Sequence, residues 1–88
     1  MRVVWAEEAL DQLSDLYVVL SLVEQDAMAK SVAGINRKLT DNPEALGESR
    51  TPWVRVWFVD GLMLRFDIDP AEQPVTVYEV TRVRPRKR

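Results

Sequence analysis

The middle of this 88-residue sequence, GESRTPWVRVWFVDGLMLRFDI from Gly47 to Ile68, concentrates arginine and tryptophan. Arg55 and Arg65 have the chemistry to bind a phosphate, because a guanidinium group pairs with anionic oxygens. Trp53 and Trp57 have rings on which a nucleobase can stack. The same residue types also form protein interfaces, or lie solvated on a sheet with an arginine against an aromatic ring. The stretch is therefore consistent with an anion-binding site, a partner-binding surface or an ordinary solvent-exposed face of a sheet.

Histidine and cysteine are both absent from the sequence. The usual near-neutral general base, the commonest transition-metal ligand and a thiolate nucleophile are therefore missing. Tyr78 and Glu48 are the candidate proton-transfer groups, although packing in the sheet for Tyr78 and an ion pair with Arg50 for Glu48 are the simpler interpretations. The acids of DIDPAE lack the glycine position of an EF-hand loop, so we expect no metal and no cofactor.

Charge is unevenly distributed along the chain. Residues 1–81 contain seven Lys/Arg against fourteen Asp/Glu, whereas residues 82–88 contain five basic residues and no acid. A polyanion contact would therefore concentrate near the C-terminus, and the acidic body is a poor match to nucleic acid. We expect one domain over residues 1–84 and a basic tail over residues 85–88.

The composition, 47% hydrophobic and 30% charged, is that of an ordinary globular protein. No apolar run reaches 18 residues, which predicts no transmembrane helix and no membrane partner. The N-terminus turns acidic after five residues, unlike a secretory signal. We therefore expect a cytoplasmic protein.

Helical periodicity dominates the first half of the sequence. Apolar residues from Ala6 to Leu20 recur at the i, i+3, i+4 spacing, and a second stripe comprises Met28, Val32, Ile35 and Leu39 before Pro43 ends the pattern. A linker of two to four residues predicts an antiparallel helical hairpin. Gly34 within the second helix predicts close packing against the first.

Strand periodicity follows, after a short β-prone opening at residues 2–5. Alternation predicts two strands joined by an Asp60-Gly61 turn and a last strand over residues 75–83. The order is β-α-α-β-β-β, an α+β fold in which the N-terminal strand and the helical hairpin pack on one face of a small antiparallel sheet.

The alternation also assigns side chains to the two sheet faces. We expect the core face to comprise Val54, Val56, Phe58, Leu62, Leu64 and Phe66. The opposite face would display Trp53, Arg55, Trp57, Met63 and Arg65. In the last strand Val75 and Val77 alternate out of phase with Val80, which favours a β-bulge.

The element order, the segment LTDNPEALGESR, the hairpin VRVWFVDGLMLRFDID and the strand VTVYEVTRVR together resemble the RelE/ParE superfamily of type II toxin–antitoxin toxins, and in particular a short plasmid-stabilisation-like branch. The resemblance covers roughly residues 3–84. It implies a growth inhibitor that a cognate antitoxin neutralises. RelE-like members are metal-independent, ribosome-dependent mRNA endoribonucleases with a basic cluster on the sheet, whereas ParE-like members lack that cluster and inhibit DNA gyrase by binding.

Carried onto this sequence, the resemblance implies two groups of site residues. Those in a catalytic role are Arg55, Arg65, Arg82 and Tyr78. Those in nucleic-acid or partner binding are Glu48, Arg50, Trp53, Trp57 and Arg84. The strand arginine of the family aligns better with Met63 than with Arg65, and the sheet strands contain no lysine.

These departures favour a toxin that binds a protein target over one that cleaves RNA efficiently. The endoribonuclease and a degenerate, non-toxic interaction domain are the alternatives. A homodimer through the tryptophan face is a further expectation.

Overall fold

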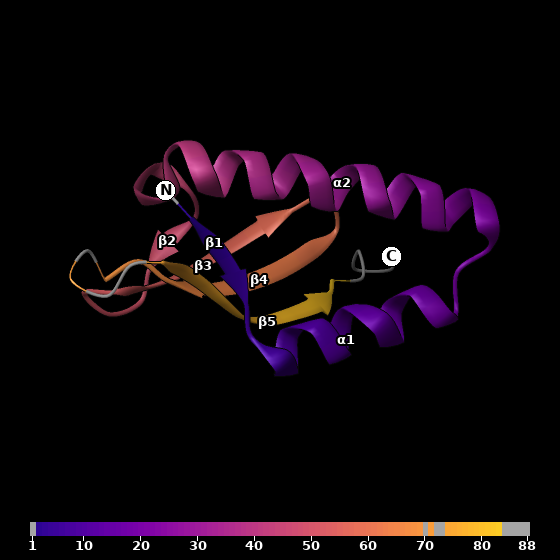
Figure 1. The fold of residues 1–88 in the computed structure, drawn as a ribbon, viewed down its shortest axis with the longest axis horizontal. Helices are drawn as coiled ribbons and strands as arrows, with labels where there is room; N and C mark the ends of the chain where they lie inside the picture. Colours follow the sequence, from indigo (N-terminus) through magenta and orange to yellow (C-terminus); the bar gives the residue numbers. More distant parts are fainter. Residues whose placement is uncertain (1, 70, 72–73, 84–88) are drawn as a thin grey trace, which may run out of the picture.

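The computed structural model describes residues 2–69, 71 and 74–83 (Figure 1). The elements in chain order are β1 (Val3–Trp5), α1 (Glu7–Val18), α2 (Leu22–Asp41), the short 3-10 helix η1 (Pro43–Ala45), β2 (Glu48–Ser49), β3 (Val54–Val59), β4 (Leu62–Asp67) and β5 (Val75–Arg82). The α+β class and the predicted order are confirmed, with η1 and β2 as short additions. None of the helices in these described ranges is long and apolar enough to cross a membrane.

The five strands form one sheet in the order β1-β5-β4-β3-β2. β1 joins it parallel to β5, with Val3 opposite Val75 and Trp5 opposite Val77, while the other neighbouring strands are antiparallel. The N–H of Ala6 donates to the Val77 carbonyl at 2.8 Å, which extends this pairing to the start of α1. The sheet is therefore mixed, and the N-terminal strand is part of it.

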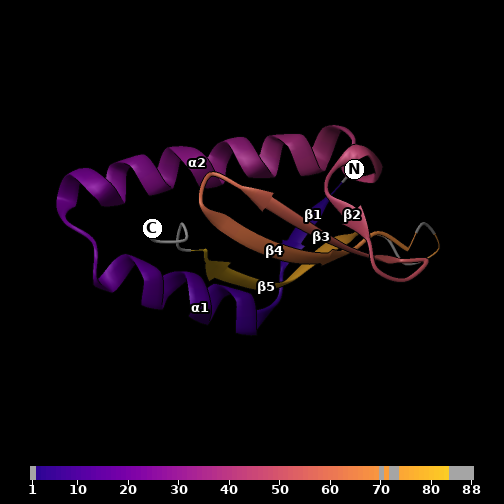
Figure 2. The same cartoon turned by 180° about the vertical axis from the view of Figure 1, so that it is seen from behind.

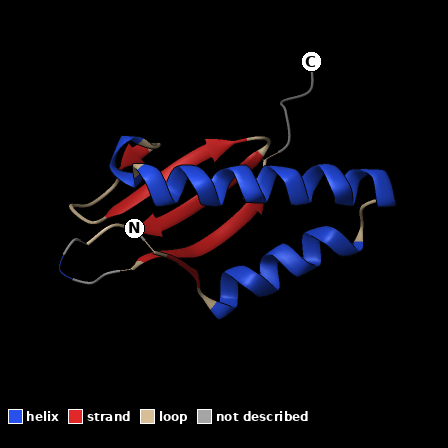
Figure 3. Ribbon diagram, turned by 45° about the horizontal axis from the view of Figure 1, so that its top comes forward, coloured by secondary structure: helices blue, strands red, loops and turns tan. Residues whose placement is uncertain are grey.

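The helical hairpin opens away from its linker, Val19 to Ser21. α1 lies along β5, whereas α2 contacts β1 and η1, so the helices diverge and meet only near the linker (Figures 2 and 3). Ser21 and Glu24 form a capping box at the start of α2. The expected close packing at Gly34 is wrong, because no atom outside its own helix lies within 4 Å of the position a Cβ would take.

One core fills the space between the helices and the sheet. The strands contribute buried side chains from Trp57, Leu62, Leu64, Phe66, Val75, Val77 and Val80, and the helices contribute Ala9, Ile35 and Leu39. The predicted stripe of α2 is confirmed, since Ile35 and Leu39 are fully buried and Met28 packs against the core. Leu10, expected on the core face of α1, is instead 51% exposed.

The face assignment of β3 is wrong. Asp60 and Gly61, both with positive φ, form the two-residue turn, so Val59 lies opposite Leu62 and Trp57 lies opposite Leu64. Trp57 therefore points into the core. Phe58 pairs with Met63 on the other face and is 59% exposed.

The predicted bulge in the last strand is confirmed. The β4–β5 register shifts between Arg65 and Phe66, whose partners are Glu79 and Val77. Tyr78 is the extra residue, and the shift lets Val77 and Val80 both face the core despite their opposite parity.

Candidate functional site

The face of the sheet opposite the core carries a groove of about 460 Å³. Its floor is formed by Val54, Arg65 and Glu79 from neighbouring strands and by Tyr78 at the bulge. One wall is α1, which contributes Glu8 and Gln12. We call this feature the sheet groove.

α1 is held at this position by a hydrogen bond to the bulged strand. The Val80 N–H donates to the Gln12 side-chain oxygen at 2.8 Å. Because β1 ends opposite Val77, β5 has no neighbouring strand on that side at Val80, and the backbone N–H needs such a partner. The contact fixes α1 beside the sheet, and Glu8, one helical turn before Gln12, reaches the same groove.

Arg65 and Glu79 form the only ion pair that the described residues make within the sheet groove. The guanidinium Nη2 lies 3.5 Å from the Glu79 carboxylate, and the two residues face each other across β4 and β5. The side chains are 53% and 33% exposed. A carboxylate this close offsets the charge that Arg65 would offer to a phosphate.

Tyr78 lies beside this pair. Its placement at the bulge leaves the residue 43% exposed and lining the groove, rather than packed within the sheet as the simpler interpretation held. The structure therefore brings Arg65 and Tyr78 together among the four residues predicted for catalysis.

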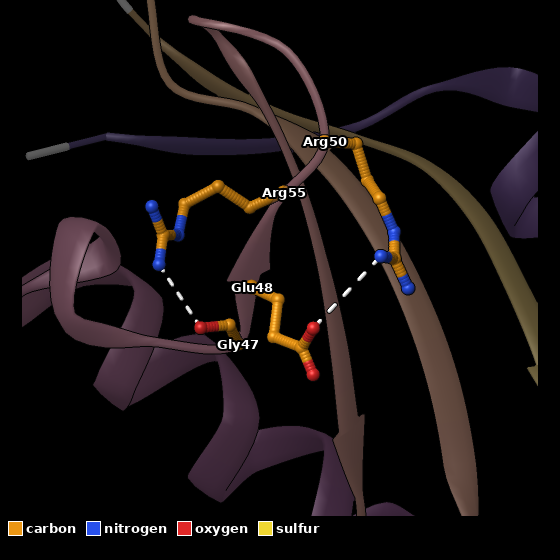
Figure 4. A network of polar contacts seen from close by, with 4 residues as sticks. All are labelled: Gly47, Glu48, Arg50 and Arg55. Carbon is orange, nitrogen blue, oxygen red and sulfur yellow. Dashed lines mark hydrogen bonds and ion pairs between the residues drawn. The ribbon is translucent and has the colours of Figure 1, made fainter.

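Arg55 lies on the other side of the sheet. Its Nε donates to the Leu46 carbonyl at 2.7 Å and its Nη2 donates to the Gly47 carbonyl at 3.0 Å (Figure 4 draws the second). A guanidinium suits this task, because its fixed fork can hold two acceptors at once. Arg55 thus fastens the segment between η1 and β2 onto β3, and the expectation that it shares a face with Arg65 is wrong.

The segment that Arg55 holds also depends on Gly47. This glycine has φ +66°, and a Cβ there would collide with the carbonyl oxygen of Val56 and stand 2.8 Å from the Trp57 Cα. Beside it, Glu48 and Arg50 form the predicted ion pair at 3.8 Å (Figure 4). Both of these side chains are more than half exposed, so the pair contributes little to stability.

Arg82 belongs to a different cleft, of about 180 Å³. It is paired opposite Leu62 on the helix-covered side and lines this cleft with Leu20, Glu24 and Met28 of the helical hairpin and Asp60 of the β3–β4 turn. Hydrogen bonding from Ser21, first from its backbone N–H and then from its hydroxyl, lowers the pKa of Glu24, and the positive charge of Arg82 acts in the same direction. Arg82 therefore faces carboxylates.

Trp53 and Trp57 do not form an exposed patch. Trp57 is buried in the core, and Trp53, just before β3, is 46% exposed. Neither lines the sheet groove. The described residues therefore do not form the exposed tryptophan face that was expected to support a homodimer.

Arg84, which the resemblance assigns to nucleic-acid or partner binding, and Glu72 of the DIDPAE segment lie outside the described residues. Within the described part, no group of three acids is arranged to hold a metal ion. Asp67 and Asp69 instead accept backbone N–H groups from Asp69 and Ala71, as turn residues do.

Sequence reasoning missed Glu8, Gln12 and Glu79 as members of the groove. For Glu79 a signal existed, because glutamate is depleted in strands and β5 otherwise consists mainly of strand-favouring valine, threonine and tyrosine. In the sequence, Glu8 and Gln12 have the pattern of the solvent-exposed face of a helix. Only the placement of α1 beside β5 brings them to the sheet.

The topology and the shape of this chain are those of the RelE/ParE superfamily fold. A chain from the chromosomal ParDE TA system of P. aeruginosa superposes with a TM-score of 0.75 and 16% identity, covering 96% of this chain and 97% of the other. The isolated E. coli RelE toxin superposes with a TM-score of 0.59, also at 16% identity, covering 97% and 86% respectively. No protein-family model matches the sequence, and no curated protein is significantly similar to it. Structural similarity at 16% sequence identity shows that this chain shares the fold of these two proteins.

Proposed function

We propose that this protein is a RelE/ParE-like toxin that inhibits growth by binding a protein target and that a cognate antitoxin neutralises. The fold supports the class, because both similar structures come from toxin–antitoxin proteins. The dispersal of Arg55, Arg65 and Arg82 supports binding over cleavage. This dispersal is the observation that carries the proposal.

The RelE-like cleavage of RNA that the resemblance implies uses a cluster of cations to stabilise charge at one phosphate, together with a proton-transfer group. Here Arg55 donates to two backbone carbonyls and Arg65 pairs with Glu79. Arg82 lies on the other side of the sheet from Arg65, beside Glu24 and Asp60. No two of these guanidinium groups line the same described cavity.

A second candidate function is a metal-independent endoribonuclease acting on mRNA at the ribosome. One observation favours it, since Arg65, Tyr78 and Glu79 line one groove and comprise a cation, a phenol and a carboxylate. In that case Arg65 would contact the phosphate, and Tyr78 or Glu79 would move the proton. The carboxylates of Glu8 and Glu79 make the groove unfavourable for a polyanion, so this candidate ranks second.

The target of the binding toxin would be a cytoplasmic protein, with DNA gyrase as the example that ParE-like toxins provide. Exposed side chains near the linker between α1 and α2 and on the β3–β4 hairpin offer apolar contact area for the target or the antitoxin. They are Val18, Val19, Leu22, Val23 and Phe58.

Induced expression in a bacterial host tests the proposal. Growth, DNA supercoiling and mRNA integrity are followed for the wild type and for Arg65→Ala. The proposal expects growth inhibition with intact mRNA, unchanged by Arg65→Ala. Unimpaired growth would reject a toxin of either kind, whereas inhibition accompanied by mRNA cleavage that Arg65→Ala abolishes would favour the nuclease.

A further inference from the structure

The sheet groove has the composition of a site for a cation. Among the described residues, two carboxylates line it, Glu8 from α1 and Glu79 from β5, against one guanidinium, that of Arg65. Asp67 lies on the same face as Arg65, two residues along β4, and opposite Val54 of the groove. The charges on and beside the groove therefore sum to an excess of acid.

The ion pair between Arg65 and Glu79 leaves carboxylate oxygens of the groove available to a ligand. Glu79 lies 3.5 Å from Arg65 but is not fully used by it, because a carboxylate accepts hydrogen bonds at two oxygens. Glu8 has no ion-pair partner among the described residues. A cation entering from solvent would meet one free carboxylate and one half-occupied carboxylate.

Tyr78 provides the second feature that a cation site needs. The residue is 43% exposed and lines the groove next to Glu79. An aromatic face attracts a guanidinium or ammonium group within about 6 Å of the ring centre. An aromatic ring combined with carboxylates selects organic cations such as arginine and lysine side chains.

Size and surroundings favour a side chain over a small metal ion. The groove, at about 460 Å³, is far larger than an ion requires, and no three acidic residues in the described chain are arranged to ligate one. Val54 adds an apolar contact, suited to the methylene stem of a long basic side chain.

We infer that the sheet groove receives an arginine or lysine side chain from a peptide segment of a protein partner, with Glu8 and Glu79 pairing with its charge and Tyr78 covering its stem or head. The inference rests on the proposed function in taking the antitoxin as that partner. Acidic charge continues along α1 through Asp11 and Asp15, and α1 has no basic residue. This stripe would draw a basic segment toward the groove and raise its association rate.

Titration of the ¹⁵N-labelled full-length protein with a synthetic probe tests the inference without any need for toxicity. The probe is the blocked peptide acetyl-Ala-Leu-Arg-Leu-Ala-amide, and its control carries citrulline in place of arginine. We expect saturable amide shifts around Glu8, Tyr78 and Glu79 with the arginine peptide, and markedly weaker binding of the citrulline peptide and at high salt.

Variants then assign the binding to the groove. Glu8→Gln and Glu79→Gln should each weaken the arginine peptide roughly threefold, as expected for one exposed charge pair. Tyr78→Leu should weaken it while Tyr78→Phe retains it, because the ring and not the hydroxyl provides the contact. Asp26→Asn is the matched control, since Asp26 is an exposed acid of α2 whose ion pair is with Lys30.

Several results would overturn the inference. They are equal binding of the citrulline peptide, shifts that map outside the groove, and affinities that Glu8→Gln and Glu79→Gln leave unchanged. Binding of a single-stranded RNA hexamer at the groove, in competition with the arginine peptide, would overturn it as well. Each of these results leaves the growth assay of the proposed function unaffected, so the two can fail separately.

Discussion

Arg55 and Arg65 project from opposite faces of the sheet. Arg55 lies opposite the buried Phe66, whereas Arg65 lies opposite Val56 and pairs with Glu79 on the open face. The arginines of the central stretch therefore do not converge, and each has its own task. Arg55 holds a loop, Arg50 joins a surface ion pair, and Arg65 lies in a groove with more acid than base.

Replacement of Arg55 should lower stability, because its guanidinium joins the η1–β2 segment to β3. Arg55→Ala is expected to reduce the free energy of unfolding by about 1–2 kcal/mol, the scale of partly exposed charge-assisted hydrogen bonds. Arg55→Lys should recover only part of this loss, since an ammonium group lacks the fork that reaches both carbonyls. Urea unfolding measures the effect, with the exposed Arg37→Ala as control. Equal stability of Arg55→Ala and Arg37→Ala would refute the loop-holding role.

Gly47→Ala should destabilise the same segment. The φ of +66° alone costs an L-residue about 1–2 kcal/mol, and the new Cβ would also collide with the Val56 backbone. We expect a lower midpoint of thermal unfolding and loss of hydrogen-exchange protection at β2. Normal protection there in Gly47→Ala would contradict this account.

Gly34→Ala should act in the opposite direction. The helix propensity gain is about 1 kcal/mol, and space is open around the position. A rise in the midpoint of thermal unfolding is therefore expected. A fall would mean that an unseen close contact requires the glycine.

Trp57 and Phe58 are adjacent large aromatic residues with opposite roles. Trp57→Ala should cost about 3–5 kcal/mol, because it empties part of the core, whereas Phe58→Ala should cost less than about 1 kcal/mol. Chemical denaturation of the two variants compares them directly. A larger loss for Phe58→Ala would restore the face assignment that the sequence pattern suggested.

The capping box of α2 makes a pH-dependent contribution to stability. The folded-state pKa of Glu24 lies below its ordinary value, chiefly through the Ser21 hydrogen bonds, so its stabilisation is present above the unfolded pKa of about 4.5 and is lost as pH falls through the folded value. Ser21→Ala should cost about 1 kcal/mol at neutral pH. In acid the difference between wild type and variant should shrink. Thermal unfolding at pH 7 and pH 3 measures this, and a difference that grows in acid would contradict it.

The wrong face assignment of β3 was avoidable from the sequence. A two-residue turn at Asp60-Gly61 places Val59 opposite Leu62, so odd residues of β3 share a face with even residues of β4. Alternation within each strand correctly separates its two faces, but the two-residue turn places the odd-numbered face of β3 beside the even-numbered face of β4. The class, the element order, the stripe of α2 and the bulge follow from periodicity because core burial imposes it.

The sheet groove could not be predicted in the same way. Its wall depends on α1 lying beside β5, where Gln12 satisfies the N–H of Val80, 68 residues away in sequence. The Arg55 contacts likewise go to backbone carbonyls of a loop, which leave no side-chain pattern to read. Contacts of these kinds arise from tertiary packing.

Incubation of the purified protein with a labelled mRNA in an actively translating bacterial extract tests the central claim most directly, with cleavage mapped by primer extension. The account predicts that no new 5′ ends appear in the mRNA, because Arg55, Arg65 and Arg82 do not converge on one phosphate. New 5′ ends that depend on the protein and disappear with Arg65→Ala, while that variant remains folded, would contradict it.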